Sequence, residues 1–308
     1  MPLALAGLFA PVVTPFDADG APDRDAFRGN VRAHRAAGLT GVVTAGSSGE
    51  AALLEDDERA RLAEWAREAL GAEATVIAGV GGESTRATVR RARDAASAGA
   101  DAVLVVAPHY YGRRMSDDAL RAHYAAVADA SPLPVLLYNI PVYAHFALAA
   151  ELVGGLAEHP NVAGMKDSAG DLAMLARYVA VQGPAFRVLT GHAGTYASAL
   201  ALGVSGGILA AALFAPQVVL AVTEAHARGD AGAVEEAQAR LTPLGRDVVA
   251  ALGPAGLKCA LDVVGLAGGA PRAPLLACTP VEGATVEARL AEAGVTTAPV
   301  AAAVGVGA

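Results

Sequence analysis

The amino-acid sequence predicts an α/β fold, a closed (β/α)8 TIM barrel with a C-terminal helical extension. Short apolar segments rich in β-branched residues recur at intervals of roughly 30 residues, as expected for successive βα units. Stretches with helix signals lie between them, and strands that are apolar throughout must be covered on both faces. An open, doubly wound sheet is the alternative that this pattern leaves.

Eight apolar segments are the predicted strands. The first follows an apolar N-terminus that lacks a basic leading region and is interrupted by Pro11 and Pro15, so it predicts a buried strand and not a signal peptide. The eight segments begin at Leu8, Gly41, Thr75, Asp101, Pro134, Asn161, Phe186 and Ser205.

Capping residues and apolar stripes mark the helices between the strands. Ser84 and Ser116 are good N-caps, and the helix after Ser116 carries Leu120, Tyr124 and Val127 on one face. Another helix runs from the region of Leu54 to a stop at Gly71, and its stripe consists of Leu62, Trp65, Ala66 and Ala69.

The chain after the eighth strand is predicted to be helical over 216–228, 232–252, 255–264 and 285–293. We therefore divide the sequence into a catalytic barrel domain (1–225), a C-terminal helical domain (226–295) and a flexible tail (296–308).

Composition excludes several classes of function. A net charge of -8 and a pI near 5.4 argue against a nucleic-acid-binding protein, which needs clustered basic residues. Cys259 and Cys278 form no CxxC or zinc-ligand pattern and are typical of thiols in a reducing compartment. No apolar run is long enough for a membrane helix, and the seven histidines form no metal motif. The sequence thus indicates a cytoplasmic protein without a metal.

Lys166 is one of only two lysines, the other being Lys258, among 23 basic residues. Strand alternation predicts that Val162, Gly164 and Lys166 share the inward face, with the lysine at the end of its strand. Burial there disfavours the ammonium and leaves a free amine able to attack a carbonyl, which a guanidinium cannot do. A structural lysine, paired for example with Asp167, is an equally open interpretation.

Tyr138 ends the preceding strand on the same face as Leu136. A phenol beside an imine-forming lysine can act as general acid and base, although a strand tyrosine alone is more often a packing residue.

Two loops offer binding groups. "TAGSSGE" places Ser47 and Ser48 in a turn of small residues that can hold a carboxylate, or that is an ordinary βα turn. "GVGGES" lacks the third glycine of a dinucleotide site. Tyr110 and Tyr111 follow the fourth strand and suggest a ligand or subunit contact, or a loop anchored by aromatic packing.

Taken together, "GSSGE", "YNIP" and "GMKDSAGD" resemble, in order and spacing, the motifs of the dihydrodipicolinate synthase and N-acetylneuraminate lyase superfamily. The resemblance extends from Leu8 to Leu276. It implies a barrel enzyme that forms a Schiff base with pyruvate or another 2-oxo acid and needs no cofactor.

The resemblance also implies roles for individual residues. Lys166 is the imine-forming lysine and Tyr138 the proton-transfer tyrosine, which Ser47 links to a second tyrosine, Tyr110, shared with a neighbouring subunit in a dimer of dimers. Ser48 and Gly49 lie in the loop that holds the substrate carboxylate, and the carbonyl of Ile208 lines the pocket. Lys258 lies on a predicted C-terminal helix, and we interpret it as structural or interfacial.

Tyr143 stands where the synthases usually carry an arginine for the carboxylate of the second substrate. Several stretches, among them "GMKDSAGD" and "GPAGLKCALDVVGLAGGAPRAPL", most resemble 4-hydroxy-2-oxoglutarate aldolases. The expected function is therefore a class I aldolase that releases pyruvate and an aldehyde from a 4-hydroxy-2-oxo acid. A dihydrodipicolinate synthase, a sugar-acid aldolase or dehydratase, a metal-dependent barrel enzyme and a non-enzymatic 2-oxo acid binder are the alternatives.

Overall fold

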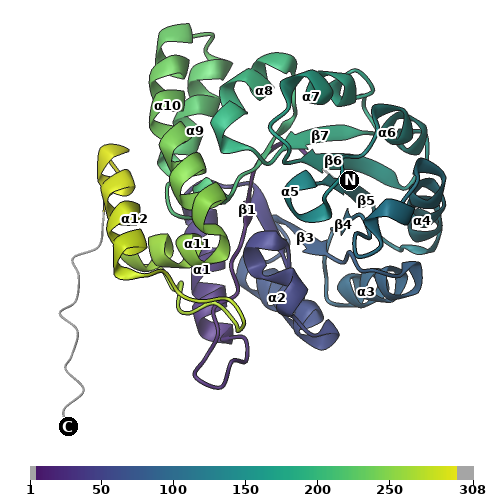
Figure 1. The fold of residues 1–308 in the computed structure, drawn as a ribbon, viewed down its shortest axis with the longest axis horizontal. Coiled ribbons are helices and arrows are strands. Elements are labelled where there is room, and N and C mark those ends of the chain that lie inside the picture. The colour runs from purple at the N-terminus through teal and green to yellow at the C-terminus, as the bar shows by residue number, and fades with distance from the viewer. Residues whose placement is uncertain (1–4, 297–308) are drawn as a thin grey trace.

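A closed barrel of eight parallel strands forms the centre of the molecule, as the computed structural model, which describes residues 5–296, shows (Figure 1). Each strand pairs with the next along the chain, and the last pairs with the first. The predicted barrel is thereby confirmed and the open sheet is excluded. The strands are β1 (Gly7–Pro11), β2 (Gly41–Thr44), β3 (Thr75–Gly79), β4 (Ala102–Val106), β5 (Val135–Asn139), β6 (Val162–Asp167), β7 (Arg187–Thr190) and β8 (Gly206–Ile208).

Helices surround the barrel (Figure 1). Two predicted caps are confirmed, since Ser84 and Ser116 accept hydrogen bonds from the amides of Ala87 and Ala119 at 3.1 and 3.3 Å. The helix that precedes Gly71 also ends there, at a glycine with a φ of 64°. The helices of this part are α1 (Arg24–Ala36), α2 (Asp56–Leu70), α3 (Thr85–Ser97), α4 (Asp117–Ala130), α5 (Pro141–Ala144), α6 (Ala150–Ala157), α7 (Leu172–Val179), α8 (Tyr196–Leu202) and α9 (Pro216–Ala227).

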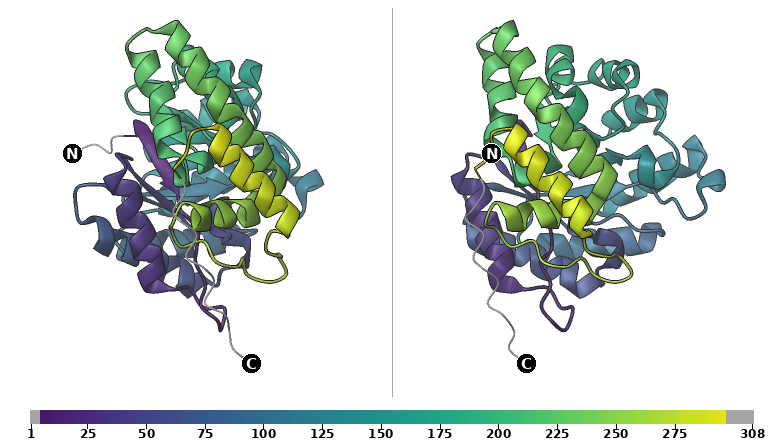
Figure 2. Two further views of the ribbon diagram at one scale, coloured as in Figure 1. Left: turned by 90° about the vertical axis from the view of Figure 1, so that its left-hand side faces the viewer. Right: turned by 60° about the vertical axis from the view of Figure 1, so that its left-hand side comes forward.

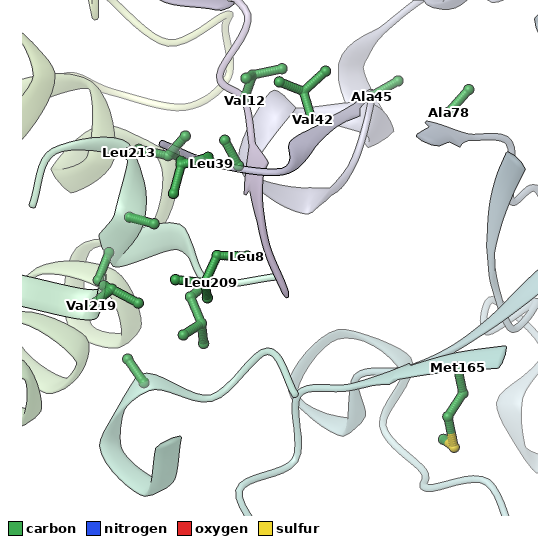
Figure 3. Close-up of a cluster of buried hydrophobic side chains, with 14 of the residues drawn as sticks. Leu8, Val12, Leu39, Val42, Ala45, Ala78, Met165, Leu209, Leu213 and Val219 are labelled. Carbon is green, nitrogen blue, oxygen red and sulfur yellow. The ribbon is translucent and has the colours of Figure 1, made fainter. Parts of the chain in front are cut away.

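Buried apolar side chains form two layers. The inner layer fills the barrel with side chains that include Phe9, Ile77, Leu136 and Leu189. The outer layer lies between strands and helices, and Figure 3 shows part of it, including Val42 and Met165 from the strands. Because both faces of each strand are buried, the strands read as nearly continuous apolar runs.

The strand that carries Lys166 differs from the prediction at one residue. The pairing of β6 with β5 skips Ala163, so this strand contains an irregularity that shifts the alternation of its side chains. Val162 therefore packs in the outer layer, whereas Ala163 packs against the inner layer, and the prediction that Val162 shares a face with Lys166 is wrong. Beyond the irregularity, Tyr138 of β5 pairs directly with Lys166.

The C-terminal helices stack beside the barrel (Figure 2). They are α10 (Ala231–Pro243), a π-helical segment η6 (Leu244–Ala250), α11 (Ala251–Val263) and α12 (Pro280–Glu292). The predicted interruption between 252 and 255 is present at Gly253, which has a φ of 55°. The predicted start of the last helix at Thr285 is wrong, because a capping box between Thr279 and Glu282 begins that helix at Pro280.

Residues 297–308 of the predicted tail lie outside the described residues, and the domain boundaries stay a prediction. Within residues 5–296, no helix is both long and apolar enough to cross a bilayer.

Candidate active site

Lys166 lies near the carboxyl end of β6, with only 6% of its surface exposed. A glycine directly after the neighbouring strand β7 makes room for it. A Cβ at position 191 would come within 2.7 Å of Lys166 Cε and 2.0 Å of Ser168 Oγ. Gly191 therefore lets the lysine side chain pass into the barrel mouth, a place that any larger residue would obstruct.

The nearest polar neighbour of the Lys166 ammonium is a phenol. Lys166 Nζ donates to Tyr138 Oη at 3.2 Å and lies 4.4 Å from the centre of the same ring. In the described part of the chain, no carboxylate oxygen lies within 4.0 Å of this nitrogen. Lys166 is thus a buried amine without a counter-ion.

Asp167 does not pair with Lys166, so the interpretation of that lysine as half of an ion pair is wrong. The Asp167 carboxylate accepts a hydrogen bond from Asn139 Nδ2 at 2.6 Å and another from the amide of Ala169 at 3.4 Å. Burial raises the pKa of Asp167, and the bond from Asn139 offsets part of that rise. Adjacent residues in a strand point to opposite faces, which explains why the two charges do not meet.

Ser47 approaches the other side of the tyrosine. It begins a 3-10 turn, η1 (Ser47–Gly49), and its hydroxyl lies 3.5 Å from Tyr138 Oη. Ser48 follows in the same turn and is half-buried. The structure therefore brings Lys166, Tyr138 and Ser47 into one chain of polar contacts.

Gly49 has a structural role in this turn. Thr14 Oγ1 donates to its carbonyl oxygen at 2.8 Å, and a Cβ would lie 2.9 Å from the carbonyl oxygen of Val12. Only a residue without a side chain fits this close approach.

Ile208 lies inside the barrel, whereas Tyr143 lies on a helix at its mouth. The side chain of Ile208 is 1% exposed and belongs to the inner apolar layer. Tyr143 lies on α5, is 46% exposed and borders the cavity at the barrel mouth. Burial raises the pKa of the Tyr143 phenol, and the charge that Tyr138 can carry raises this pKa further.

Tyr110 does not join the group within one chain. It is 77% exposed and packs edge-on against Tyr111 at 4.9 Å between ring centres. Its backbone amide donates to Glu83 Oε2 at 2.9 Å. The contact of Tyr110 with a neighbouring subunit stays a prediction.

A cavity of about 630 Å³ opens beside Ser47 and extends towards α2 and α3. Lys166 and Tyr138 do not line it, but Ser47, which contacts Tyr138, does. Its walls also carry two arginines, two histidines and two glutamates. The lining residues are Ser47, Glu50, Ala51, Ala52, Leu53, Arg59, Gly81, Gly82, Glu83, Arg91, Val106, Ala107, His109, Ile140, Tyr143, His145, Pro254, Pro274 and Leu275.

The sequence analysis missed the contacts that hold the serine turn. Glu50, directly after that turn, forms a buried ion pair of 2.6 Å with Lys258 and accepts the amide of Arg272 at 2.8 Å. Lys258 also donates to the carbonyl of Ala270 at 2.9 Å, while the Arg272 guanidinium binds both oxygens of Glu58 at 2.6 and 2.7 Å. The interpretation of Lys258 as structural agrees with these contacts. A glutamate in a loop of small residues was the available signal.

No cluster of three or more histidine, cysteine, aspartate or glutamate side chains in residues 5–296 is arranged to hold a metal ion. The functional groups at the barrel mouth, within the described residues, are an amine, hydroxyls and charged side chains.

Comparison with known proteins agrees with this geometry. The dihydrodipicolinate synthetase family matches residues 4–293. A 4-hydroxy-tetrahydrodipicolinate synthase of Exiguobacterium sp. is 34% identical over 287 residues, which cover 93% of this chain and 96% of that protein. An uncharacterized DapA-like lyase of Halobacterium salinarum is 40% identical over 297 residues, or 95% of both chains. The solved structure of YagE, a prophage protein of the dihydrodipicolinic acid synthase family from E. coli K12 in complex with pyruvate, matches with a TM-score of 0.89 and 28% identity. That match covers 96% of this chain and 100% of YagE.

Proposed function

The chain belongs to the dihydrodipicolinate synthetase family, whose members are pyruvate-dependent carbon–carbon lyases, and we propose that it is a metal-independent class I aldolase for a 4-hydroxy-2-oxo acid. The substrate class includes 4-hydroxy-2-oxoglutarate, and the products are pyruvate and an aldehyde such as glyoxylate. The observation that carries the proposal is the buried Lys166 amine, which contacts the Tyr138 hydroxyl at 3.2 Å and has no carboxylate within 4.0 Å.

Lys166 provides the nucleophile. Its free amine attacks the C2 carbonyl of the 2-oxo acid, and loss of water from the carbinolamine leaves a protonated imine. The imine then accepts the electron pair of the C3–C4 bond as that bond breaks.

Tyr138 provides the proton transfer. As a general base it takes the proton from the C4 hydroxyl while C3–C4 cleavage releases the aldehyde and leaves an enamine. Protonation of the enamine at C3 and hydrolysis of the resulting imine release pyruvate and return Lys166 to the free amine. Ser47, 3.5 Å from Tyr138, extends the path along which this proton can move.

Substrate orientation comes from the serine turn. We assign the substrate carboxylate to Ser47, Ser48 and the backbone of Gly49, and we assign the carbonyl of Ile208 to the lining of the pocket. Fixing the carboxylate holds C2 against the amine, which converts a bimolecular encounter into a positioned reaction.

A 4-hydroxy-tetrahydrodipicolinate synthase is the second candidate, since the curated Exiguobacterium relative carries that name. It would use the same lysine and tyrosine. Tyr143, in the position where the sequence resemblance implies an arginine in synthases, favours the aldolase, because a phenol cannot form the paired hydrogen bonds of a guanidinium with a carboxylate.

The test is borohydride reduction in the presence of pyruvate, followed by peptide mass spectrometry. We expect an adduct on Lys166 in the wild type and none in Lys166→Arg. An adduct on another residue, or none at all, contradicts the proposal. Retro-aldol assays with 4-hydroxy-2-oxoglutarate, compared with condensation assays with aspartate semialdehyde, then separate the two candidates.

The proposed assembly is a homo-oligomer in which Tyr110 enters the site of a neighbouring subunit. Its exposure of 77% in one chain supports the proposal. If it is right, Tyr110→Phe lowers activity without changing the unfolding midpoint, and sedimentation shows an oligomer.

A further inference from the structure

The two cysteines, which eighteen residues separate in the sequence, approach each other between α11 and α12. Cys259 lies on α11, and Cys278 directly precedes Thr279, the N-cap of α12. A Cβ at Gly283, in the first turn of α12, would lie 3.9 Å from Cys259 Sγ. The Cys259 thiol therefore points at the start of α12, where Cys278 lies. Both thiols are free and half-buried, so a small reagent can reach them.

The two thiols are close enough to influence each other. Burial, followed by the neighbouring Cys278 thiol, raises the pKa of Cys259 to about 11. Burial is also the largest cause that raises the pKa of Cys278, and the interaction with Cys259 opposes part of that rise. Each group therefore carries its proton at neutral pH, which is the resting state of a thiol pair that reacts only when a thiolate forms.

Acidic side chains lie around the pair. The charges of Asp262 and Glu287 add to the rise in the pKa of Cys259, and the charge of Glu282 adds to the rise in the pKa of Cys278. Negative surroundings disfavour a thiolate and attract a cationic reagent. The pair is therefore matched to a cationic small disulfide and not to an anionic one.

A bond between the two sulfurs would close a loop that already holds the serine turn. Lys258, next to Cys259, pairs with Glu50 at 2.6 Å. Arg272, which lies between the two cysteines in the sequence, donates its amide to Glu50 at 2.8 Å. Residues 264–279 form neither helix nor strand, so a cross-link near both ends of this segment would restrict it.

We propose that Cys259 and Cys278 form a thiol pair that a small disulfide of the aminothiol class converts to an internal disulfide, and that this bond restrains residues 264–279, which contact the serine turn. In the first step one cysteine loses its proton, and its sulfur attacks the small disulfide, forms a mixed disulfide and releases one aminothiol. In the second step the other cysteine attacks the sulfur of the first and releases the second aminothiol. The two cysteines are oxidised, the small disulfide is reduced to two thiols, and the two cysteine protons go to the released thiolates.

The first experiment treats the reduced protein with cystamine, a dicationic disulfide, at about pH 8.5, where more thiolate is present. Remaining thiols are blocked with iodoacetamide before peptide mass spectrometry. We expect the wild type to contain a peptide pair in which Cys259 and Cys278 of one chain are linked, and dithiothreitol should break that link. Cys259→Ser and Cys278→Ser are matched controls for each other, and each should stop at the mixed disulfide because the second step lacks its nucleophile.

Three outcomes overturn the pair. They are mixed disulfides that persist in the wild type, a link between two chains on a non-reducing gel, and two thiols that stay unreacted. Cys278→Ala replaces Cys278→Ser if circular dichroism shows that the serine variant is unfolded.

The second experiment compares hydrogen exchange in the oxidised and the reduced wild type. We expect exchange in residues 264–279 to slow by about tenfold or more on oxidation. Exchange in α4, on the opposite side of the barrel (Figure 1), should stay the same. Cys278→Ser after the same treatment is the control and should exchange like the reduced wild type.

Unchanged exchange in residues 264–279, or an equal slowing in α4, overturns the restraint. Neither experiment depends on turnover. Failure of the Lys166 adduct would reject the proposed function alone and leave both results standing.

Discussion

Two lysines of this chain are both buried, and their surroundings differ in one partner. Lys166 is 6% exposed and Lys258 is 0% exposed. Each ammonium lies over an aromatic ring, at 4.4 Å from the centre of Tyr138 and 4.3 Å from the centre of Phe16. The polar neighbour of Lys166 is a phenol, whereas Lys258 contacts the carboxylate of Glu50 at 2.6 Å. Burial alone therefore does not make a lysine a nucleophile.

The carboxylate of Glu50 is the feature that distinguishes the surroundings of Lys258 from those of Lys166. Burial lowers the pKa of Lys258, and the hydrogen bond and charge of Glu50 oppose that change. Lys166, which has no carboxylate within 4.0 Å in the described residues, is therefore the lysine to which we assign the proposed covalent chemistry, whereas Lys258 links the serine turn to α11.

The largest expected effect is the loss of activity in Lys166→Met. Removing the nucleophile should lower kcat by roughly a thousandfold or more, while the free energy of unfolding changes by at most about 1 kcal/mol because volume is conserved and no ion pair is broken. Steady-state kinetics and urea denaturation measure the two quantities. Activity above a few per cent of wild type would show that another group carries the chemistry.

Lys258→Met should produce the opposite pattern. It leaves the buried Glu50 carboxylate without its cation, and breaking a buried pair in this way costs about 3–5 kcal/mol of unfolding free energy. The double variant Lys258→Met/Glu50→Gln should recover part of that loss in urea denaturation. A single variant as stable as the wild type would mean that the ion pair does not hold the turn.

Tyr138→Phe tests the partner of the reactive lysine. The phenol is expected to supply proton transfer, so kcat should fall about a hundredfold or more, while the borohydride adduct on Lys166 still forms. A kcat within threefold of wild type would assign the proton transfer to another group.

The same comparison extends to a buried imidazole. His34 is 1% exposed, and its Nε2 has no hydrogen-bond partner in the described residues. Burial lowers the pKa of His34 from 6.5 to about 4. Between these values the unfolded chain binds a proton that the folded chain does not, so stability is full above pH 6.5 and declines as the pH falls toward 4. From pH 7 to pH 5 the loss should be about 2 kcal/mol for this residue.

Urea denaturation of the wild type and His34→Leu at both pH values measures that difference, and His123 contributes equally to both proteins. His226→Gln, which changes an exposed histidine of α9, is the matched control and should retain the wild-type pH dependence. The prediction is wrong if His34→Leu loses as much stability as the wild type.

Local sequence patterns predicted the barrel because strands, helix caps and helix stops depend mainly on residues that are close together in the sequence. The eight apolar segments, the caps at Ser84 and Ser116 and the stop at Gly71 each depend on a few neighbouring residues. The start of the last helix could also have been predicted, since Thr279 and Glu282 have the spacing of a capping box. The skipped Ala163 could not, because a strand irregularity depends on pairing with another strand.

The candidate site was predicted in part for the same reason. Lys166 and Tyr138 lie near the carboxyl ends of neighbouring strands, so the barrel itself brings them together. Contacts between distant segments, such as that of Glu50 with Lys258 and Arg272, leave no periodic signal in the sequence.

The ion pair of Glu50 with Lys258 also has a consequence for folding during synthesis, because Lys258 follows all eight strands in the sequence. All eight strands, with the lysine and tyrosine of the proposed chemistry, leave the ribosome before Lys258 is translated. Until α11 docks, the acidic residue after the serine turn lacks its counter-charge. A nascent or prematurely terminated polypeptide that ends before α11 therefore contains all eight strands but lacks the cation that pairs with Glu50, so the turn to which we assign the substrate carboxylate is fixed only after the barrel has been made.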